Sequence, residues 1–175
     1  MTVSQEELDP ATHDAIKAHS AKGDEFAAAQ AFEEAIAEYD KAWALLPNPK
    51  NEWNASTWIL AAIADAAFLA GYKTSAREAL QYAMTCPGAI GNLFLHLRYG
   101  QILMDAGELD AAANELMRAY MAEGSGIFAA EDPRYLDFLK TRANLWVSAD
   151  HAPEAARACR RIEPGDSSET ASRTG

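Results

Sequence analysis

The sequence has 175 residues, of which 49% are hydrophobic and 23% are charged, a balance that suits one soluble globular domain and excludes disorder throughout. A formal net charge of −11 disfavours nucleic acid as a ligand, because two polyanions repel each other, and favours a basic protein partner. The charge-free stretch through the apolar middle, residues 53–64, is well short of the roughly 20 residues that span a bilayer, so no membrane segment is predicted.

The N-terminal residues and the cysteines indicate the compartment. Residues 1–10 are polar and acidic and lack the basic and apolar regions of a signal peptide, so we expect a cytoplasmic protein. Cys86 and Cys159 match no zinc-ligand spacing and suggest no disulfide framework. We expect both to be reduced thiols.

One helix-pair pattern occurs three times between residues 14 and 124. In each copy apolar residues recur at three- and four-residue steps, small residues hold fixed offsets in the second helix, and Gly or Pro ends the pair. The residues that carry the pattern are Gly23, Phe26, Phe32, Ala35, Tyr39, Ala42 and Pro47, then Gly71, Ala76, Leu80, Ala83 and Pro87, then Gly100, Leu103, Gly107, Leu109, Ala112, Leu116, Ala119 and Gly124. One pair cannot bury its own apolar face, so we expect the three pairs to stack on a continuous core.

The spacing of these residues resembles that of tetratricopeptide repeat proteins. Gly71 and Gly107 are 36 positions apart, and Ala35 and Ala76 are 41 apart, against a unit of about 34 residues in that family. The family has a turn glycine, an aromatic, an alanine, a large apolar residue and a second alanine at the positions of Gly107, Leu109, Ala112, Leu116 and Ala119. The departures are at His19, Leu60 and His96, where the family often has tryptophan, and at Gln30, which replaces the first turn glycine. Residues 43–142 also resemble small uncharacterised bacterial proteins of this type.

The resemblance implies an all-α fold, a right-handed α-solenoid of about three helix pairs with a C-terminal capping helix. We expect the capping helix to start at Asp132 and Pro133, because aspartate caps helix N-termini and proline fits the first turn. Its apolar stripe is Tyr135, Leu136, Phe138, Leu139 and Trp146. Residues 124–126 are predicted to be a flexible link before it. The repeat domain with its cap is therefore expected over residues 1–149, followed in residues 150–175 by a short helix at 152–161 and a disordered tail from residue 163.

No pattern in the sequence indicates catalysis, a cofactor or a metal ion. The ten glycines form no phosphate-binding loop, and no Glu-x-x-His pair offers a di-metal site. A thiol enzyme built on Cys86 and His96 is disfavoured by the Pro-Gly turn between them. Glu33, Glu34 and Glu38 follow helical spacing and are expected on a solvated face. We therefore expect a protein that is not an enzyme, since an enzyme would need polar groups that converge in a pocket.

The first helices of successive pairs line a concave groove in tetratricopeptide repeat proteins, and the resemblance places residues of this chain in it. They are Lys17, Ser20, Asp24 and Ala27 in the first pair, Trp58, Ala61, Asp65 and Phe68 in the second, and Phe94, Leu97, Gln101 and Met104 in the third. Asp24 and Asp65 would pair with Lys or Arg of a partner, and the aromatic residues and Met104 would anchor it. The alternative for Trp58, Phe68 and Phe94 is packing between helices.

The groove lacks the carboxylate clamp with which some members of the family read the acidic C-termini of chaperones. Ser20, Asp24, Ala62 and Phe94 stand where the clamp has lysines and asparagines, and only Arg98 matches it. Binding of chaperone tails is therefore not expected.

These features lead to the hypothesis of a non-catalytic adaptor that recruits or neutralises a basic protein partner through an acidic and apolar groove. The candidate partner-binding residues are Lys17, Asp24, Trp58, Asp65, Phe68, Phe94, Arg98, Gln101 and Met104. The alternatives are an immunity protein that neutralises a secreted bacterial toxin such as a type VI secretion effector, a secretion chaperone, and a scaffold that associates with itself. A further hypothesis places a second surface at residues 48–50, a predicted surface loop flanked by Trp53 and Trp58.

Overall fold

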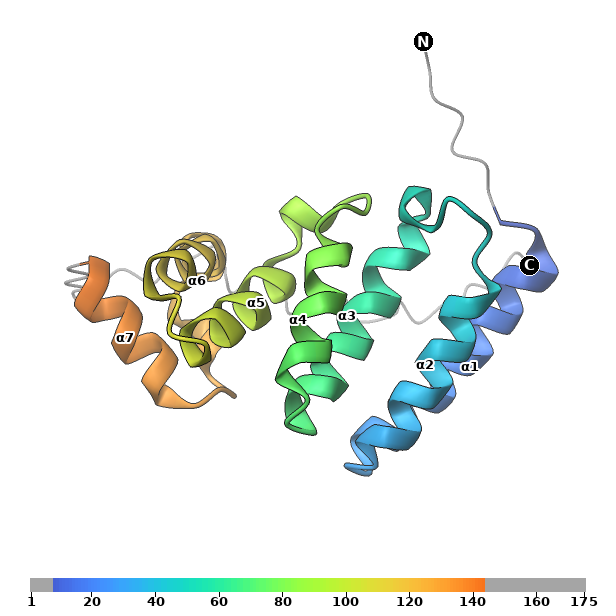
Figure 1. Ribbon diagram of the computed structural model, residues 1–175, viewed down its shortest axis with the longest axis horizontal. Helices are drawn as coiled ribbons and strands as arrows, with labels where there is room; N and C mark the ends of the chain where they lie inside the picture. The colour runs from blue at the N-terminus through green and yellow to red at the C-terminus, as the bar shows by residue number, and fades with distance from the viewer. Residues whose placement is uncertain (1–7, 144–175) are drawn as a thin grey trace, which may run out of the picture. The chain divides into compact units, whose positions relative to one another are not determined.

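The computed structural model describes residues 8–143, which form seven α-helices and three short 3-10 helices (Figure 1). The α-helices are α1 (Pro10–Ala28), α2 (Phe32–Leu45), α3 (Asn54–Leu69), α4 (Lys73–Ala83), α5 (Leu93–Asp105), α6 (Leu109–Glu123) and α7 (Pro133–Ala143). The 3-10 helices are η1 (Lys50–Glu52), η2 (Ala89–Gly91) and η3 (Gly124–Phe128). This part of the chain contains no strand, which confirms the all-α class predicted from the sequence. None of these helices combines the length and the apolar character that crossing a membrane would require.

Consecutive helices pack as antiparallel pairs, and each pair packs on the next. The closest packing is within the pairs α1–α2, α3–α4 and α5–α6, and α2 joins the first pair to α3 of the second. The alanines of the repeat pattern are fully buried where a second helix crosses its neighbours: Ala35 and Ala42 in α2, Ala76 and Ala83 in α4, Ala112 and Ala119 in α6. Alanine at these positions lets helix axes approach closely, so the predicted stack of helix pairs is confirmed.

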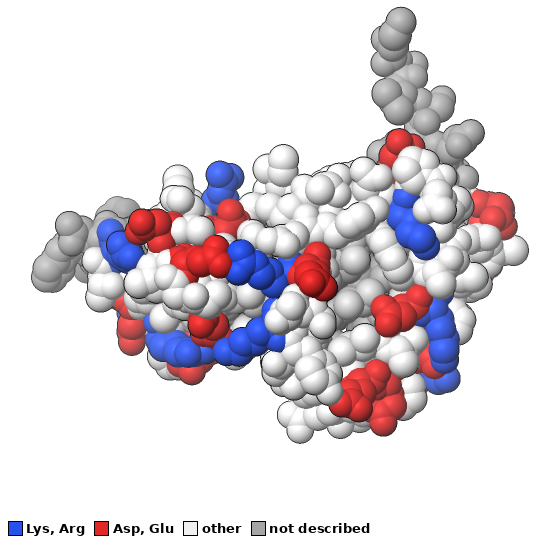
Figure 2. All heavy atoms as spheres, in the orientation of Figure 1, with Lys and Arg blue, Asp and Glu red and all other residues white. Residues whose placement is uncertain are grey.

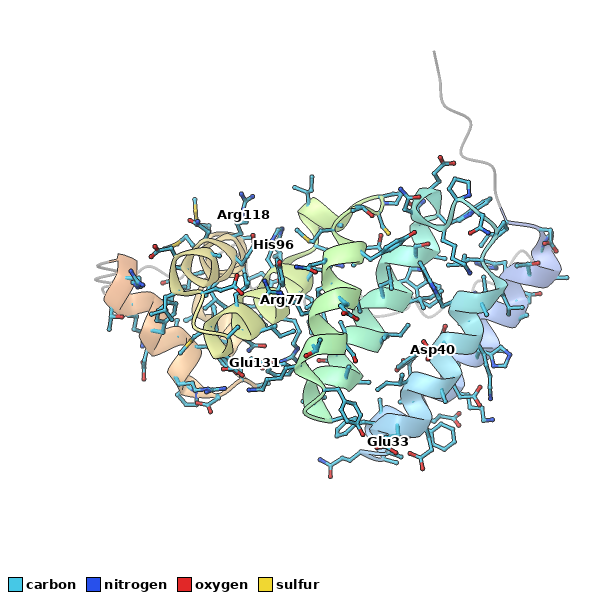
Figure 3. The ribbon with its side chains drawn as sticks, viewed as in Figure 1. Glu33, Asp40, Arg77, His96, Arg118 and Glu131 are labelled. Carbon is cyan, nitrogen blue, oxygen red and sulfur yellow. The ribbon has the colours of Figure 1, made fainter. Side chains whose placement is uncertain are left out.

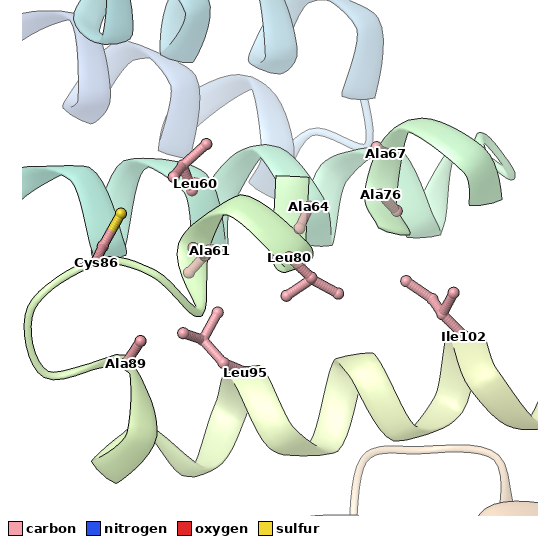
Figure 4. Packing of buried hydrophobic residues seen from close by; sticks show 11 residues of the cluster. Leu60, Ala61, Ala64, Ala67, Ala76, Leu80, Cys86, Ala89, Leu95 and Ile102 are labelled. Atoms are coloured by element: carbon pink, nitrogen blue, oxygen red, sulfur yellow. The ribbon is translucent and has the colours of Figure 1, made fainter. Parts of the chain in front are cut away.

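The middle pair contributes the largest core cluster, shown in Figure 4. Leu80 of α4 is fully buried there between side chains of α3 and α5, among them Ala64, Leu95 and Ile102. Cys86 belongs to the same cluster, and burial raises the pKa of its thiol. A buried thiol that is kept protonated acts as a small apolar core residue. Cys159 lies outside the described residues.

In the first and third helix pairs, a glycine of the first helix lies directly against a large side chain of the second helix. A Cβ at Gly23 would lie 2.4 Å from the ring of Tyr39, and a Cβ at Gly100 would lie 2.7 Å from the side chain of Leu116. Both glycines are buried inside helices, where a glycine ordinarily costs stability relative to alanine. Here the missing Cβ makes room for the large side chain of the second helix.

Replacing Gly100 by alanine is therefore expected to destabilise the protein by about 1–2 kcal/mol, despite the higher helix propensity of alanine. The new Cβ would also lie 3.0 Å from the backbone nitrogen of Leu116, which cannot rotate away. Urea unfolding measures the effect. Gly91→Ala is the matched control, because a Cβ at Gly91 meets no atom within 4 Å. An unchanged or raised stability of Gly100→Ala would contradict this packing.

A histidine–glutamate pair joins the two helices of the first and third pairs at equivalent positions. Nδ1 of His19 lies 2.8 Å from Oε2 of Glu38, and Nδ1 of His96 lies 2.5 Å from Oε2 of Glu115. In the middle pair the equivalent positions hold Leu60 and Ala79, which are both apolar. In the middle pair, both the histidine and the glutamate are thus replaced by apolar residues.

Glu38 corrects the expectation that the acidic face of α2 is solvated throughout. Its side chain is only 5% exposed, and besides His19 it accepts from Nζ of Lys41 at 2.8 Å and of Lys22 at 2.9 Å. The hydrogen bonds from Lys41, His19 and Lys22, in that order of size, lower the pKa of Glu38 to about 2. Glu33 and Glu34 are exposed as expected.

Because the pKa of Glu38 is lowered, the contribution of Glu38 to the stability of the fold is expected to decrease in acid. A carboxyl with a depressed pKa in the folded state contributes stability above its unfolded pKa, near 4.5, and loses it as the pH falls toward 2. We expect Glu38→Gln to be less stable than the wild type at pH 7, with a difference that shrinks between pH 4.5 and 2. Urea unfolding across this range checks it, with Glu34→Gln as control on the same helix. A difference independent of pH would contradict the assignment.

At the C-terminal end of the described chain, α7 agrees with the predicted capping helix, whereas the segment before it is not the predicted flexible link. Asp132 caps α7 as expected, since its Oδ1 accepts from the backbone N–H of Arg134 at 3.0 Å. Tyr135 and Leu139 pack with Phe128 into the cluster that covers α6. The link predicted to be flexible at residues 124–126 is part of η3, because burial of Phe128 fixes it. Trp146, the predicted helix at 152–161 and the predicted disordered tail lie outside the described residues.

Candidate binding groove

A hollow of about 300 Å³ lies between α1, α3 and α5. Its lining is mostly apolar, with two carboxylates and one phenol among the alanines. The lining residues are Asp24, Ala27, Tyr39, Ala61, Ala62, Asp65, Ala66, Leu69 and Phe94. The first helices of all three pairs therefore contribute to one concave feature, and Leu69, with 50% of its surface exposed, is the most exposed of the apolar lining residues.

Asp24 and Ala27 both belong to α1 and lie one turn apart, so the same face of this helix brings both to the hollow. Its Oδ1 accepts a hydrogen bond of 2.8 Å from the hydroxyl of Tyr39 on α2. The pKa of Tyr39 is raised well above its ordinary value, chiefly by burial, then by this hydrogen bond and by the charges of Asp24 and Asp65. The negative charges of Asp24 and Asp65 thus both act on the hydroxyl of Tyr39, which lines the hollow.

Asp65 on α3 is held by Arg98 of α5, whose Nη2 lies 2.6 Å from Oδ1 of Asp65. The side chain of Asp65 remains 33% exposed, whereas that of Arg98 is 5% exposed. The contact is a close ion pair whose angles do not suit a hydrogen bond, and within the described residues Nε of Arg98 has no hydrogen-bond partner either. Asp65 is therefore fixed in position while still facing the solvent of the hollow.

Arg98 belongs to a buried polar network that ties α5 to the segment before α7. Its Nη1 donates to Oε1 of Gln101 at 2.7 Å and to Oε2 of Glu131 at 3.0 Å, and Nε2 of Gln101 donates to the same carboxylate at 2.8 Å. The guanidinium also lies 4.5 Å from the ring centre of Phe68 and 5.3 Å from that of Phe94. Glu131 can be followed in Figure 3. With two carboxylates on it, Arg98 is not available as a site for an anionic ligand.

The predicted groove residues separate into those that line the hollow and those that do not. Asp24, Ala27, Ala61, Asp65 and Phe94 line it. Trp58 is 40% exposed on α3, one turn before Ala62, and Lys17 is exposed on α1. Phe68 and Met104 are half-buried among core side chains, and Arg98 and Gln101 are buried in the network described above. A direct contact of Gln101 with a partner is excluded in this conformation, because the residue is 0% exposed.

Tyr39, Ala66 and Leu69 line the hollow but were not predicted from the sequence. Tyr39 was assigned to the repeat core, and it reaches the hollow because Gly23 leaves room for its ring beside α1. The signal that could have found it is the pairing of a buried glycine with a large aromatic in the facing helix. Leu69 lies one turn beyond Asp65 on the same face of α3, so extension of the predicted face by one turn would have included it.

The loop at residues 48–50, predicted as a second interaction surface, is exposed at Asn48 and Pro49 but anchored by its neighbours. Nε1 of Trp53 donates to the carbonyl of Pro47 at 2.9 Å, and Oγ of Ser56 donates to the carbonyl of Lys50. Figure 2 shows a mostly uncharged surface over the upper parts of α3 and α4, bordered at the loop by both basic and acidic side chains. Charge complementarity therefore does not point to a partner there.

The described residues also show what they offer toward a metal site or a catalytic site. Among residues 8–143 no group of three or more His, Cys, Asp or Glu side chains could hold a metal ion. The polar groups that converge at the hollow are two aspartates and a tyrosine whose pKa lies far above neutral pH, which is not an arrangement of nucleophile and base. The hollow is suited to binding.

Comparison with known proteins supports the fold. No protein-family model matches the sequence, and no curated protein matches it. Among solved structures, the chain is similar to the tetratricopeptide repeat domain of Sgt2 from Aspergillus fumigatus, with a TM-score of 0.55 and 18% sequence identity. The match covers 100% of this chain and 97% of that chain. The arrangement of helix pairs predicted from the repeat pattern is thus confirmed as a tetratricopeptide-like fold.

Proposed function

We propose that this chain is a non-catalytic protein-binding module whose partner contributes a basic segment to the hollow between α1, α3 and α5. The observation that carries the proposal is the placement of Asp24 and Asp65, from two different helix pairs, in one concave and otherwise apolar feature. Concave surfaces across stacked helix pairs are what repeat proteins of this architecture offer to extended ligands.

The charge balance at the hollow favours a cation. Among the described residues, Asp24 and Asp65 line the hollow and no lysine or arginine does. Arg98, the cation that pairs with Asp65, is shared with Glu131 outside the lining, so its charge does not neutralise the two aspartates. The whole chain carries −11, which adds long-range attraction for a basic partner. Apolar walls lower the local dielectric and strengthen an ion pair formed inside the hollow.

The test is affinity capture from cells of the source organism, followed by measurement with the purified partner. We expect a basic protein that binds the wild type in a simple stoichiometric ratio and more weakly as salt is raised, because salt screens the attraction. Asp24→Lys is expected to weaken binding by about tenfold or more, since it leaves like charges facing each other. Calorimetry with the purified pair measures both effects.

Asp14→Lys is the matched control, because it makes the same charge change on α1 at a side chain that is 82% exposed and outside the hollow. Equal affinity of the wild type and Asp24→Lys would contradict the proposal. The identity of the captured protein separates toxin neutralisation from secretion-chaperone or scaffold roles, and capture of a second copy of this chain would indicate self-association.

A further inference from the structure

In each of the two carboxylates of the hollow, one oxygen is already in contact with another side chain. Oδ1 of Asp24 already accepts from the Tyr39 hydroxyl at 2.8 Å, and Oδ1 of Asp65 faces Nη2 of Arg98 at 2.6 Å. Among the described residues no hydrogen bond or ion pair involves Oδ2 of either aspartate, so Oδ2 is the oxygen of each that is left for an incoming donor. The two presented oxygens come from different helices, α1 and α3.

This arrangement distinguishes between the two basic side chains. Arginine gains its advantage over lysine from a planar fork that binds both oxygens of one carboxylate. In each aspartate here, one of the two oxygens is already engaged, by Tyr39 or by Arg98. An ammonium group is a compact charge with three donors that rotate freely, so it can donate to single oxygens from two different residues.

The walls of the hollow suit the rest of a lysine side chain. Ala27, Ala61, Ala62, Ala66 and Leu69 are apolar and small or flexible, and they would contact the four methylene groups of the stem. The ring of Phe94 lines the hollow too, but the Arg98 guanidinium already lies 5.3 Å from its centre, which leaves it less favourable for stacking a second guanidinium. The volume of about 300 Å³ is roughly ten times that of a water molecule, which accommodates a long side chain.

We infer that the hollow is a lysine pocket: it accepts one lysine side chain of the partner, with the ammonium between Asp24 and Asp65 and the stem against the alanines, in preference to arginine. This inference rests on the proposed function and specifies the residue that is recognised. Acetylation of that lysine would remove the charge and with it the recognition.

The experiment uses the full chain, immobilised, and four pools of nine-residue peptides, acetylated at the N-terminus and amidated at the C-terminus. The central residue is fixed as Lys, Arg, Nε-acetyl-lysine or norleucine, and the other positions hold mixtures of uncharged residues. Each peptide thus carries at most one charge. Retention of each pool is measured on the wild type, on Asp24→Asn and on Asp14→Asn. Asparagine at position 24 keeps an oxygen that can accept from Tyr39, and circular dichroism checks that the variant is folded.

We expect the lysine pool to be retained about fivefold more than the norleucine, acetyl-lysine and arginine pools. This preference should disappear in Asp24→Asn and persist in Asp14→Asn. Arginine retained as well as lysine, with both above norleucine, would overturn the lysine pocket and leave the proposed function standing. A lysine preference that survives in Asp24→Asn would also overturn it, by placing recognition elsewhere. Retention of neither basic pool above norleucine would contradict both the inference and the proposed function.

Discussion

Replacing Glu131 by alanine is expected to lower the free energy of unfolding by about 3 kcal/mol, because it leaves the buried guanidinium of Arg98 and the amide of Gln101 without their main acceptor. The expected loss of stability lies at the lower end of what removing one partner of a buried ion pair costs, because the Glu131 side chain keeps 17% of its surface exposed and Asp65 still faces Arg98. The cost arises from a desolvated charge rather than from lost packing. Urea unfolding of the wild type and the variant measures it.

Asp137→Ala is the matched control for Glu131. It removes a carboxylate of the same C-terminal region. The Asp137 side chain is 68% exposed, and within residues 8–143 its ion pair is with Lys140 at 3.2 Å. Its expected effect is within about 0.5 kcal/mol. A loss of less than about 1 kcal/mol for Glu131→Ala would show that the network around Arg98 contributes little to holding the C-terminal cap.

Replacing Leu80 by alanine is expected to cost about 3–4 kcal/mol, the typical result of a cavity in a core that cannot collapse around it. Leu80 is 0% exposed and contacts α3 and α5 at once, so its removal weakens both the middle pair and the junction with the third pair (Figure 4). A chain of stacked repeats is stable through contacts between neighbours, so a defect in the middle of the stack affects both ends.

The comparison for Leu80 is Leu109→Ala, which deletes the same atoms from a residue that is 40% exposed at the start of α6. Its expected cost is below about 1 kcal/mol, because less apolar surface returns to water. Thermal and urea unfolding of both variants give the difference. Equal losses for the two leucines would contradict the central position of Leu80 in the core.

The sequence was sufficient to predict the helix pairs because their determinants are local. The buried alanines recur at fixed offsets, and glycine at 71 and 107 adopts the positive φ that the turn within each pair requires. Gln30 holds the equivalent place in the first pair and takes the same left-handed conformation, with φ of 60°. The turn was therefore predictable even where the glycine is absent, because the surrounding pattern determines it.

The polar interior was not predictable, because it depends on contacts between residues far apart in the chain. Arg98 and Gln101 stand on the predicted groove face of α5, yet Glu131, which is 33 and 30 positions away from them in the chain, covers them. Glu38 follows the spacing of a solvated face and is buried by Lys22 and His19 of the preceding helix. Helical periodicity shows which side of a helix a residue occupies, but not which later segment packs on that side.

Binding of a basic segment in the hollow is tested most directly by methyl NMR of the full chain labelled at its alanine methyl groups. Ala27, Ala61, Ala62 and Ala66 line the hollow, whereas the exposed Ala44 on α2 and Ala111 on α6 lie outside it. On titration with the peptide pool whose central residue is lysine, we predict shifts of the four methyl signals that saturate together and that are absent with the norleucine pool. Shifts at Ala44 or Ala111 with the four signals unchanged would contradict binding in the hollow.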